Sequence, residues 1–155
     1  KAETLKNAEP VIKNNLGAVA LKDGDVKKAE TLFGAAAGAG NEVNYNLGIV
    51  SMKNGEYDKA VKYFVKDDDI NTALANMMAG NNNTALQDLE AYDNPNSYMK
   101  EYLKAVIGAR TAKENLLFES LEKACTINPD MKAKAHNDME FARYFENPKF
   151  NEIVK

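Results

Sequence analysis

The sequence has few of the residues on which several classes of function depend. Cys125 is its only cysteine, so no disulfide can form within the chain. His136 is its only histidine, and a metal site needs three or four ligands. No run of about 18 apolar residues occurs, so no membrane span is predicted. No signal peptide is visible, and because the first residue is lysine rather than methionine, we expect the chain to be a fragment of a larger protein.

Positive charge of the kind that recognises nucleic acid is also scarce. The chain has 20 lysines and arginines against 23 aspartates and glutamates, which gives a net charge of −3. Only Arg110 and Arg143 are arginines, the residue type that most often contacts phosphates and base edges. A nucleic-acid partner is therefore not expected.

What the sequence does contain is an internal repeat. Residues 14–33 (NNLGAVALKDGDVKKAETLF) align with residues 45–64 (YNLGIVSMKNGEYDKAVKYF) at a constant offset of 31 residues, and nine of the twenty aligned positions are identical. Each copy has apolar residues at helical spacing, then a short turn with Gly24 or Gly55, then a second apolar stretch. The pattern predicts a helix, a turn and a second helix in each copy, and hence an all-α fold.

Small residues opposite large ones indicate how the two helices of each copy would pack. Gly17 and Gly48 stand inside the first helices, where glycine costs roughly 1 kcal/mol relative to alanine, so a packing reason is expected for both. Two weaker copies follow, at residues 73–89 and 97–129. The predicted packing residues of all copies are Leu16, Gly17, Ala29, Phe33, Leu47, Gly48, Ala60, Phe64, Ala85, Leu89, Leu121 and Ala124.

The spacing of these residues resembles the tetratricopeptide repeat (TPR) family. The resemblance implies a right-handed α-solenoid of about four TPR-like helix pairs with a C-terminal capping helix. The fourth copy departs from the pattern because Ala112 replaces the turn glycine. In the cap, Asn128-Pro129 would start a helix that runs to about Phe145, and Asn147-Pro148 would start a short last helix. The predicted units span about residues 10–40, 41–66, 67–94 and 96–128, the cap spans 129–155, and residues 1–9 would be the tail of a preceding unit.

Two stretches resemble ligand-binding loops but lack part of what such loops require. GAAAGAG, residues 34–40, is rich in glycine like a phosphate-binding loop, but no strand precedes it and no GKS or GKT follows. We expect Gly38 and Gly40 to mark the end of a helix instead. Asp67, Asp69 and Asn71 match the first positions of a calcium loop, but the required glycine is missing from the next position, so a helix cap is expected there.

The remaining candidates for chemistry are isolated. His136 and Glu140 are spaced to share a helix face, but no second histidine joins them, so a surface helix is expected. Cys125 lies beside the packing residue Ala124, which indicates a buried structural thiol. The sequence therefore predicts no catalytic residue, no metal site and no cofactor.

A polar stripe on the predicted first helices is the strongest candidate for a binding site. Asn15 and Asn46 occupy equivalent repeat positions, and Lys22 and Lys53 follow on the same helix faces. In the TPR family the first helices line the concave groove, and an asparagine at this position often bonds the backbone of a bound peptide. An asparagine amide can donate and accept, which matches a peptide unit. The predicted groove residues are Asn15, Lys22, Asn46, Ile49, Lys53, Asn71 and Leu74.

The resemblance implies a non-catalytic scaffold that binds a protein or an extended peptide segment on its concave face. Two alternatives remain open: a structural spacer or oligomerisation module of a larger envelope protein, and a regulatory segment of an enzyme whose catalytic domain is missing from this sequence. A homo-oligomer is compatible with the first. An alternative interpretation of the asparagines is that they are solvated or form hydrogen bonds between helices. The closing region also resembles TPR segments of exported envelope proteins of Bacteroidales-type bacteria, which implies the periplasm or the outer membrane as a location.

Overall fold

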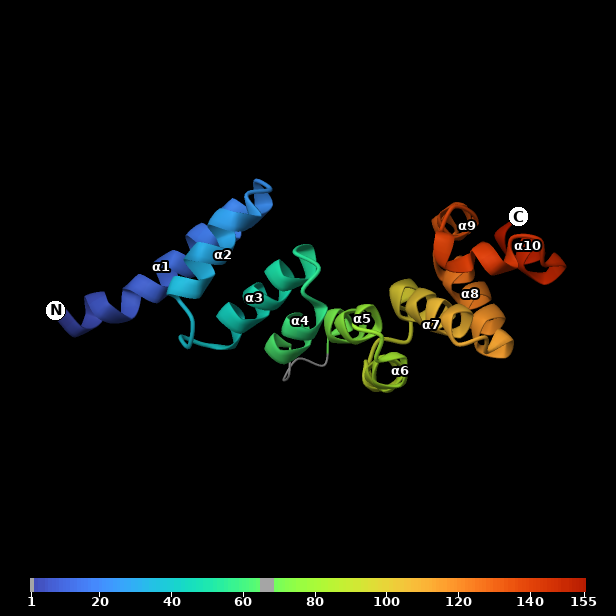
Figure 1. Cartoon of the computed structure of the whole chain (residues 1–155), viewed down its shortest axis with the longest axis horizontal. Coiled ribbons are helices and arrows are strands. Elements are labelled where there is room, and N and C mark those ends of the chain that lie inside the picture. Colours follow the sequence, from blue (N-terminus) through green and yellow to red (C-terminus); the bar gives the residue numbers. More distant parts are fainter. Residues whose placement is uncertain (1, 65–68) are drawn as a thin grey trace. The chain divides into compact units, whose positions relative to one another are not determined.

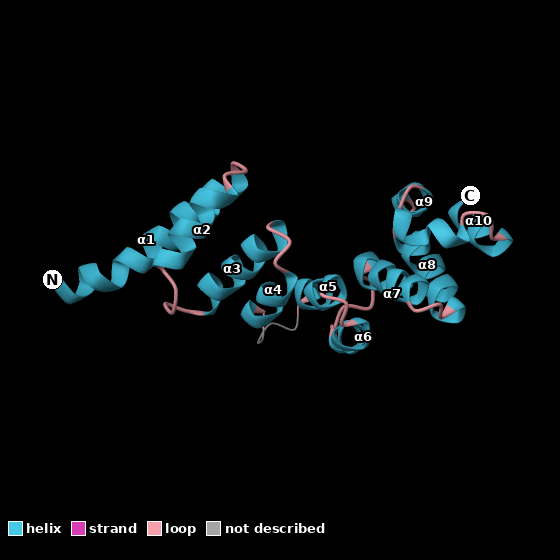
Figure 2. Ribbon diagram, viewed as in Figure 1, coloured by secondary structure: helices cyan, strands magenta, loops and turns pink. Residues whose placement is uncertain are grey.

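The computed structural model describes the backbone of residues 2–64 and 69–155, and the side chains of residues 8–64 and 69–155. Every regular element in these ranges is a helix (Figure 1, Figure 2). The chain divides into two compact units, residues 1–67 (unit 1) and residues 68–155 (unit 2), and each is described by itself. Unit 1 contains α1 (Ala2–Lys22), α2 (Val26–Ala35), α3 (Asn41–Lys53) and α4 (Tyr57–Tyr63). Unit 2 contains α5 (Ile70–Met78), α6 (Asn82–Ala91), α7 (Tyr98–Arg110), α8 (Glu114–Ile127), α9 (Asp130–His136), the 3-10 helix η1 (Met139–Tyr144) and α10 (Pro148–Val154).

Unit 1 is built from two helix pairs. Helix α2 packs along α1, α4 packs along α3, and α2 also contacts α3 (Figure 1). A Cβ added at Gly17 would lie 2.6 Å from the ring of Phe33, and one at Gly48 would lie 2.5 Å from the ring of Phe64. Each glycine therefore makes room for the phenylalanine of its partner helix, which is the packing reason that the sequence indicated.

The turns between paired helices have the same hydrogen bonds in both units. In the first, the N–H of Gly24 donates to the carbonyl of Leu21 at 3.2 Å, and the N–H of Asp25 donates to the carbonyl of Ala20 at 2.9 Å. This pattern is a Schellman motif, which requires a residue with positive φ. The residue with positive φ is Gly24 in the first helix pair (83°), Gly55 in the second (75°), Gly80 in the third (85°) and Ala112 in the fourth (55°). Ala112 thus occupies the turn position that glycine occupies in the other three pairs.

Unit 2 contains two further helix pairs, α5 with α6 and α7 with α8, followed by α9, η1 and α10. Aromatic rings of η1 pack on the α7–α8 pair. Phe141 of η1 meets Tyr102 of α7 edge-on, with ring centroids 5.7 Å apart, and Phe118 of α8 meets Tyr144 at 6.0 Å. The cap and the fourth helix pair therefore share one hydrophobic core.

The cap differs from the predicted single helix ending near Phe145, and that prediction is wrong. Helix α9 ends at His136, and the chain continues into the 3-10 helix η1. Asp138 explains the interruption, because one of its oxygens accepts from the N–H of Glu140 at 3.1 Å and the other accepts from the hydroxyl of Tyr102 at 2.7 Å. His136 and Glu140 therefore lie on different helices, and they do not share a helix face as predicted.

Three further predictions concern Pro10, the glycine-rich stretch at residues 34–40 and the aspartates before α5. Helix α1 is continuous through Pro10, so the end of the predicted preceding unit and the start of the predicted first unit lie on one helix. Helix α2 ends at Ala35 and so includes Gly34, while Gly38 and Gly40 lie in the link to α3, with φ of +83° and +155°. Asp69 caps α5 as expected, while Asp67 lies outside the described residues.

Leu16 is the one predicted packing residue that the structure does not bury. Its side chain is 52% exposed, so its assignment to the core of unit 1 is wrong. Leu47, its equivalent in the next repeat, is buried with Ala29 and Phe33 of α2. The difference arises because α3 has the preceding helix pair beside it, whereas no described helix of unit 1 covers this face of α1. The other eleven predicted packing residues are all buried.

Candidate functional site

The predicted groove residues of unit 1 lie on its two first helices, α1 and α3. Asn15 and Lys22 are exposed on α1, and Lys53 is exposed near the end of α3. Asn46 and Ile49, also on α3, are half-buried. The face therefore combines polar side chains that solvent can reach with one partly exposed aliphatic residue, which suits a surface that contacts another polypeptide.

Asn46 already has a partner within the protein. Its side-chain Nδ2 donates a hydrogen bond of 2.9 Å to Oδ1 of Asn14, a buried residue on α1. The bond joins the first helices of two successive pairs. Because Nδ2 is turned toward Asn14, the carbonyl end of the Asn46 amide is turned the other way. One asparagine is thus held in a fixed orientation by another.

A hollow of about 400 Å³ lies beside this hydrogen bond. Asn14 and Asn46 line it together with Asn41, Glu42 and Tyr45 from the first half of α3. The ring of Tyr45 packs edge-on against Phe64, with centroids 5.4 Å apart, so the wall that it forms is anchored to the core of the α3–α4 pair. The hollow is rich in amide groups, which can pair with the backbone of an extended chain.

The two remaining predicted groove residues, Asn71 and Leu74, lie on α5 of unit 2, and both are half-buried. The backbone N–H of Asn71 donates to Oδ1 of Asp69 at 3.4 Å, and its side-chain Nδ2 lies 3.4 Å from Oδ2 of the same residue. Asn71 therefore takes part in the cap of α5. The candidate site is therefore the group of residues on α1 and α3.

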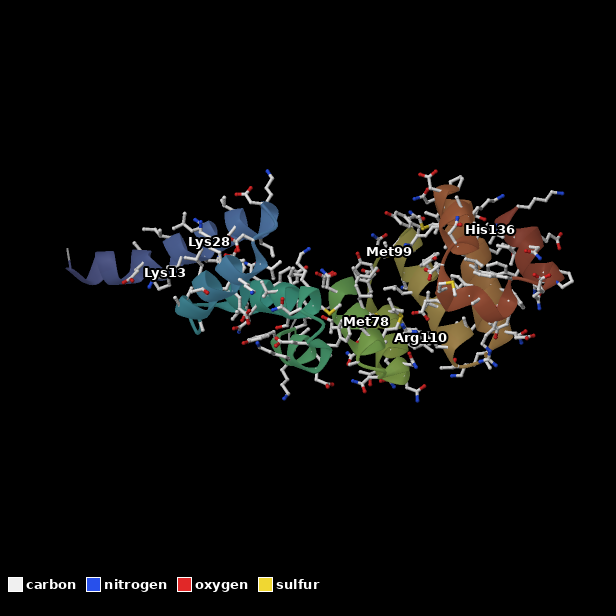
Figure 3. The ribbon with its side chains drawn as sticks, turned by 45° about the horizontal axis from the view of Figure 1, so that its top comes forward. Lys13, Lys28, Met78, Met99, Arg110 and His136 are labelled. Atoms are coloured by element: carbon white, nitrogen blue, oxygen red, sulfur yellow. The ribbon has the colours of Figure 1, made fainter. Side chains whose placement is uncertain are left out.

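Unit 2 has a second polar cluster, centred on Arg110. The guanidinium donates from Nε and Nη2 to the two carboxylate oxygens of Glu140, and from Nη1 to the backbone carbonyl of Met77 at 2.7 Å. Figure 3 shows Arg110 close to Met78, the residue after that carbonyl. The hydrogen bond to Glu140 raises the pKa of Arg110, because it stabilises the charged guanidinium. Because these partners belong to α5 and to the cap, Arg110 joins α7 to both.

The chain's one cysteine and one histidine lie on different helices. Cys125 is buried on α8, and His136 is exposed at the end of α9 (Figure 3). In the described part of the chain, no group of three or more histidine, cysteine, aspartate or glutamate side chains is placed to hold a metal ion. No helix among the described residues combines the length and the apolar character that crossing a membrane requires.

Burial raises the pKa of the Cys125 thiol, and this leads to a prediction about its reactivity. We expect a thiol-labelling reagent to modify the native protein much more slowly than the denatured chain, because the thiolate is the reactive form. Stability should also fall as the pH rises above about 8.5, since the thiol then ionises in the unfolded chain but stays protonated when folded. Equal labelling rates for native and denatured protein, followed by absorbance, would contradict the assignment of Cys125 as a buried thiol.

The geometry identifies a helical-repeat protein, in which successive helix pairs share one turn motif and one packing pattern, as in an α-solenoid. Residues 42–66, which include most of α3 and all of α4, match the family model of the tetratricopeptide repeat. No curated protein sequence matches the chain. A tetratricopeptide repeat indicates a role in protein–protein interaction, and proteins of this family are generally non-catalytic scaffolds.

The sequence-based interpretation missed two residues that organise the polar sites. Asn14 gave no signal, because the repeat alignment pairs it with Tyr45 and its hydrogen bond runs to a residue at a different repeat position. Arg110 did give a signal: it is one of two arginines in a chain whose other basic residues are lysines. Arginine is favoured where a planar, two-pronged contact with a carboxylate is needed, and its contact with Glu140 is of that kind.

Proposed function

We propose that the protein is a non-catalytic scaffold that binds an extended protein segment on the face formed by α1 and α3. The observation that carries the proposal is the Asn46–Asn14 hydrogen bond beside the amide-rich hollow. Asn14 fixes the orientation of the Asn46 amide before any partner arrives, which lowers the entropy that binding would otherwise lose. The remaining donor and acceptor capacity of Asn46 can then pair with a peptide group of the partner.

The other face residues extend this contact along the partner. Asn15 occupies the repeat position of Asn46 on α1 and is exposed. Lys22 and Lys53 supply positive charge that attracts carboxylates, and Ile49 supplies an apolar contact. Asn71 and Leu74 of unit 2 occupy the repeat positions of Asn46 and Ile49, and their role in binding stays a prediction for that unit by itself. Because each hydrogen bond adds only about 0.5–1.5 kcal/mol, affinity would come from several such contacts.

The same hydrogen bond supports a second candidate, a structural module with no peptide on this face. In that case Asn46 ties α3 to α1, and the bond fixes the spacing of the two helix pairs. The two candidates differ in what the removal of Asn46 affects: a binding role changes affinity for a partner, and a purely structural role changes stability alone.

Asn46→Ala is expected to weaken the binding of an extended peptide roughly 2- to 10-fold, because it removes about one hydrogen bond to the peptide backbone. The probe is a peptide selected on the wild-type protein from a displayed library of unstructured peptides, and titration calorimetry measures the dissociation constant. The free energy of unfolding should fall by no more than about 2 kcal/mol, as expected for one lost bond that leaves the Asn14 acceptor unpaired.

Asn44→Ala is the matched control, because it changes the same residue type on the same helix, two residues away and hence on a different face. It should leave the dissociation constant unchanged. A loss of more than about 2 kcal/mol of stability in Asn46→Ala, with unchanged peptide affinity, would contradict the binding role and support the structural module.

A further inference from the structure

Helix α1 carries an exposed apolar stripe that the proposed peptide-binding face does not use. Ile12, Leu16 and Val19 are 56%, 52% and 57% exposed. Their spacing along the helix places all three side chains on one face. Large apolar side chains that gather on one face, and do not lie scattered singly, mark a site of interaction with another protein.

The internal repeat shows what covers the equivalent residues of α3. At the offset of 31 residues, Ile12, Leu16 and Val19 correspond to Val43, Leu47 and Val50 of α3. Those three residues are only 4%, 6% and 1% exposed. They share one hydrophobic cluster with Ala29, Phe33 and Ala36, which belong to α2 and its C-terminal cap. The same apolar triplet is thus buried by a preceding helix pair in one repeat and exposed in the other.

We propose that the stripe of Ile12, Leu16 and Val19 docks a further helix pair of the same type, whose second helix presents small and aromatic residues spaced like Ala29, Phe33 and Ala36. The interface would continue the α2–α3 interface by one repeat. A second copy of this chain cannot supply that surface from its own α2, because Ala29 and Phe33 are fully buried there. The occupant is therefore a separate helix pair with a free second-helix face.

Two features of the sequence agree with an occupant of this kind. Pro10 corresponds to Asn41, the first residue of α3, and proline is well suited to the first turn of a helix. A repeat-type helix could therefore begin at Pro10 as α3 begins at Asn41. The pentapeptide KAETL occurs both at residues 1–5 and at residues 28–32 within α2. The sequence before Pro10 is thus of the second-helix type.

The test uses the natural chain and an extended chain in which residues 1–40 are followed directly by residues 10–155. The junction places Gly40 before Pro10, as Gly40 normally precedes Asn41, so the added helix pair has the register of the α2–α3 interface. Leu16→Gln, made in the copy that follows the junction, removes the central side chain of the stripe. Leucine and glutamine have similar helix propensity, so the substitution reports on burial.

In the natural chain, Leu16→Gln should leave the midpoint of urea denaturation, followed by circular dichroism, nearly unchanged. In the extended chain it should lower the midpoint by about as much as Leu47→Gln does. Leu47→Gln changes the equivalent residue of the next repeat and serves as the control. If Leu47→Gln prevents folding, Leu16→Ala and Leu47→Ala provide the same comparison with a milder change.

Two outcomes would overturn the proposal. The first is an effect of the Leu16 substitutions that is equally small in both chains, which would mean that the stripe does not accept a helix pair. The second is a dimer of the natural chain, detected by sedimentation velocity and abolished by Leu16→Gln, which would make a second copy the occupant.

Discussion

Replacing Phe141 with alanine is expected to lower the free energy of unfolding by about 3–5 kcal/mol, the usual range for a fully buried phenylalanine. Phe141 is fully buried, and its ring lies 5.7 Å from the rings of both Tyr102 and Phe150, measured between centroids. It is therefore the residue through which η1 contacts both α7 and α10. Truncation would leave a cavity where three elements meet, and guanidinium denaturation followed by circular dichroism would measure the loss.

Met139→Ala is the control for this substitution, because Met139 belongs to the same 3-10 helix and is 76% exposed. Its effect should stay within about 0.5 kcal/mol. Similar effects of the two substitutions would mean that the cap does not pack on the α7–α8 pair in the way the structure describes.

Gly108→Ala is expected to destabilise the protein by at least about 1–3 kcal/mol, even though alanine is the better helix former. A Cβ at Gly108 would lie 2.6 Å from the backbone nitrogen of Leu117 and 2.8 Å from its Cα. Backbone atoms cannot rotate away as a side chain can, so helix α8 would have to move relative to α7. Thermal and urea denaturation should both report the loss.

Gly34→Ala makes the same chemical change where the space is open, and its expected effect has the opposite sign. Gly34 lies in α2, and a Cβ there would meet nothing within 4 Å. The substitution should stabilise the protein by up to about 1 kcal/mol through helix propensity alone. A destabilisation by Gly34→Ala, or a neutral Gly108→Ala, would contradict the helix packing described here.

The sequence predicted those parts of the fold that depend on local chemistry. Turn glycines and apolar spacing were sufficient to predict the helix pairs, because both signals come from residues close together in the chain. The exposure of Leu16 could not be predicted in this way. Leu16 and Leu47 have nearly the same neighbours in sequence, and they differ only in whether a preceding helix pair lies beside them.

The candidate site was predicted in part. The repeat alignment drew attention to Asn46, but the residue that holds its amide, Asn14, follows no repeat pattern. In the cap, Asn137-Asp138 interrupts what apolar spacing alone indicates to be one helix. The cause is the hydrogen bond from Tyr102 to Asp138, which joins residues far apart in the chain. Side-chain hydrogen bonds of this kind leave no periodic signal in a sequence.

In both helix pairs of unit 1 a phenylalanine ring packs against a glycine. This contact limits the substitutions that the protein can accept during evolution. A side chain larger than hydrogen at Gly17 or Gly48 collides with the ring of Phe33 or Phe64. A smaller side chain in place of either ring leaves a cavity. The energetic effects of the two positions are thus coupled, and they should not add. Glycine and phenylalanine are expected to be inherited together in related sequences, and to be replaced together by another small and large pair, such as the Ala73 and Leu89 that occupy these positions in the third helix pair.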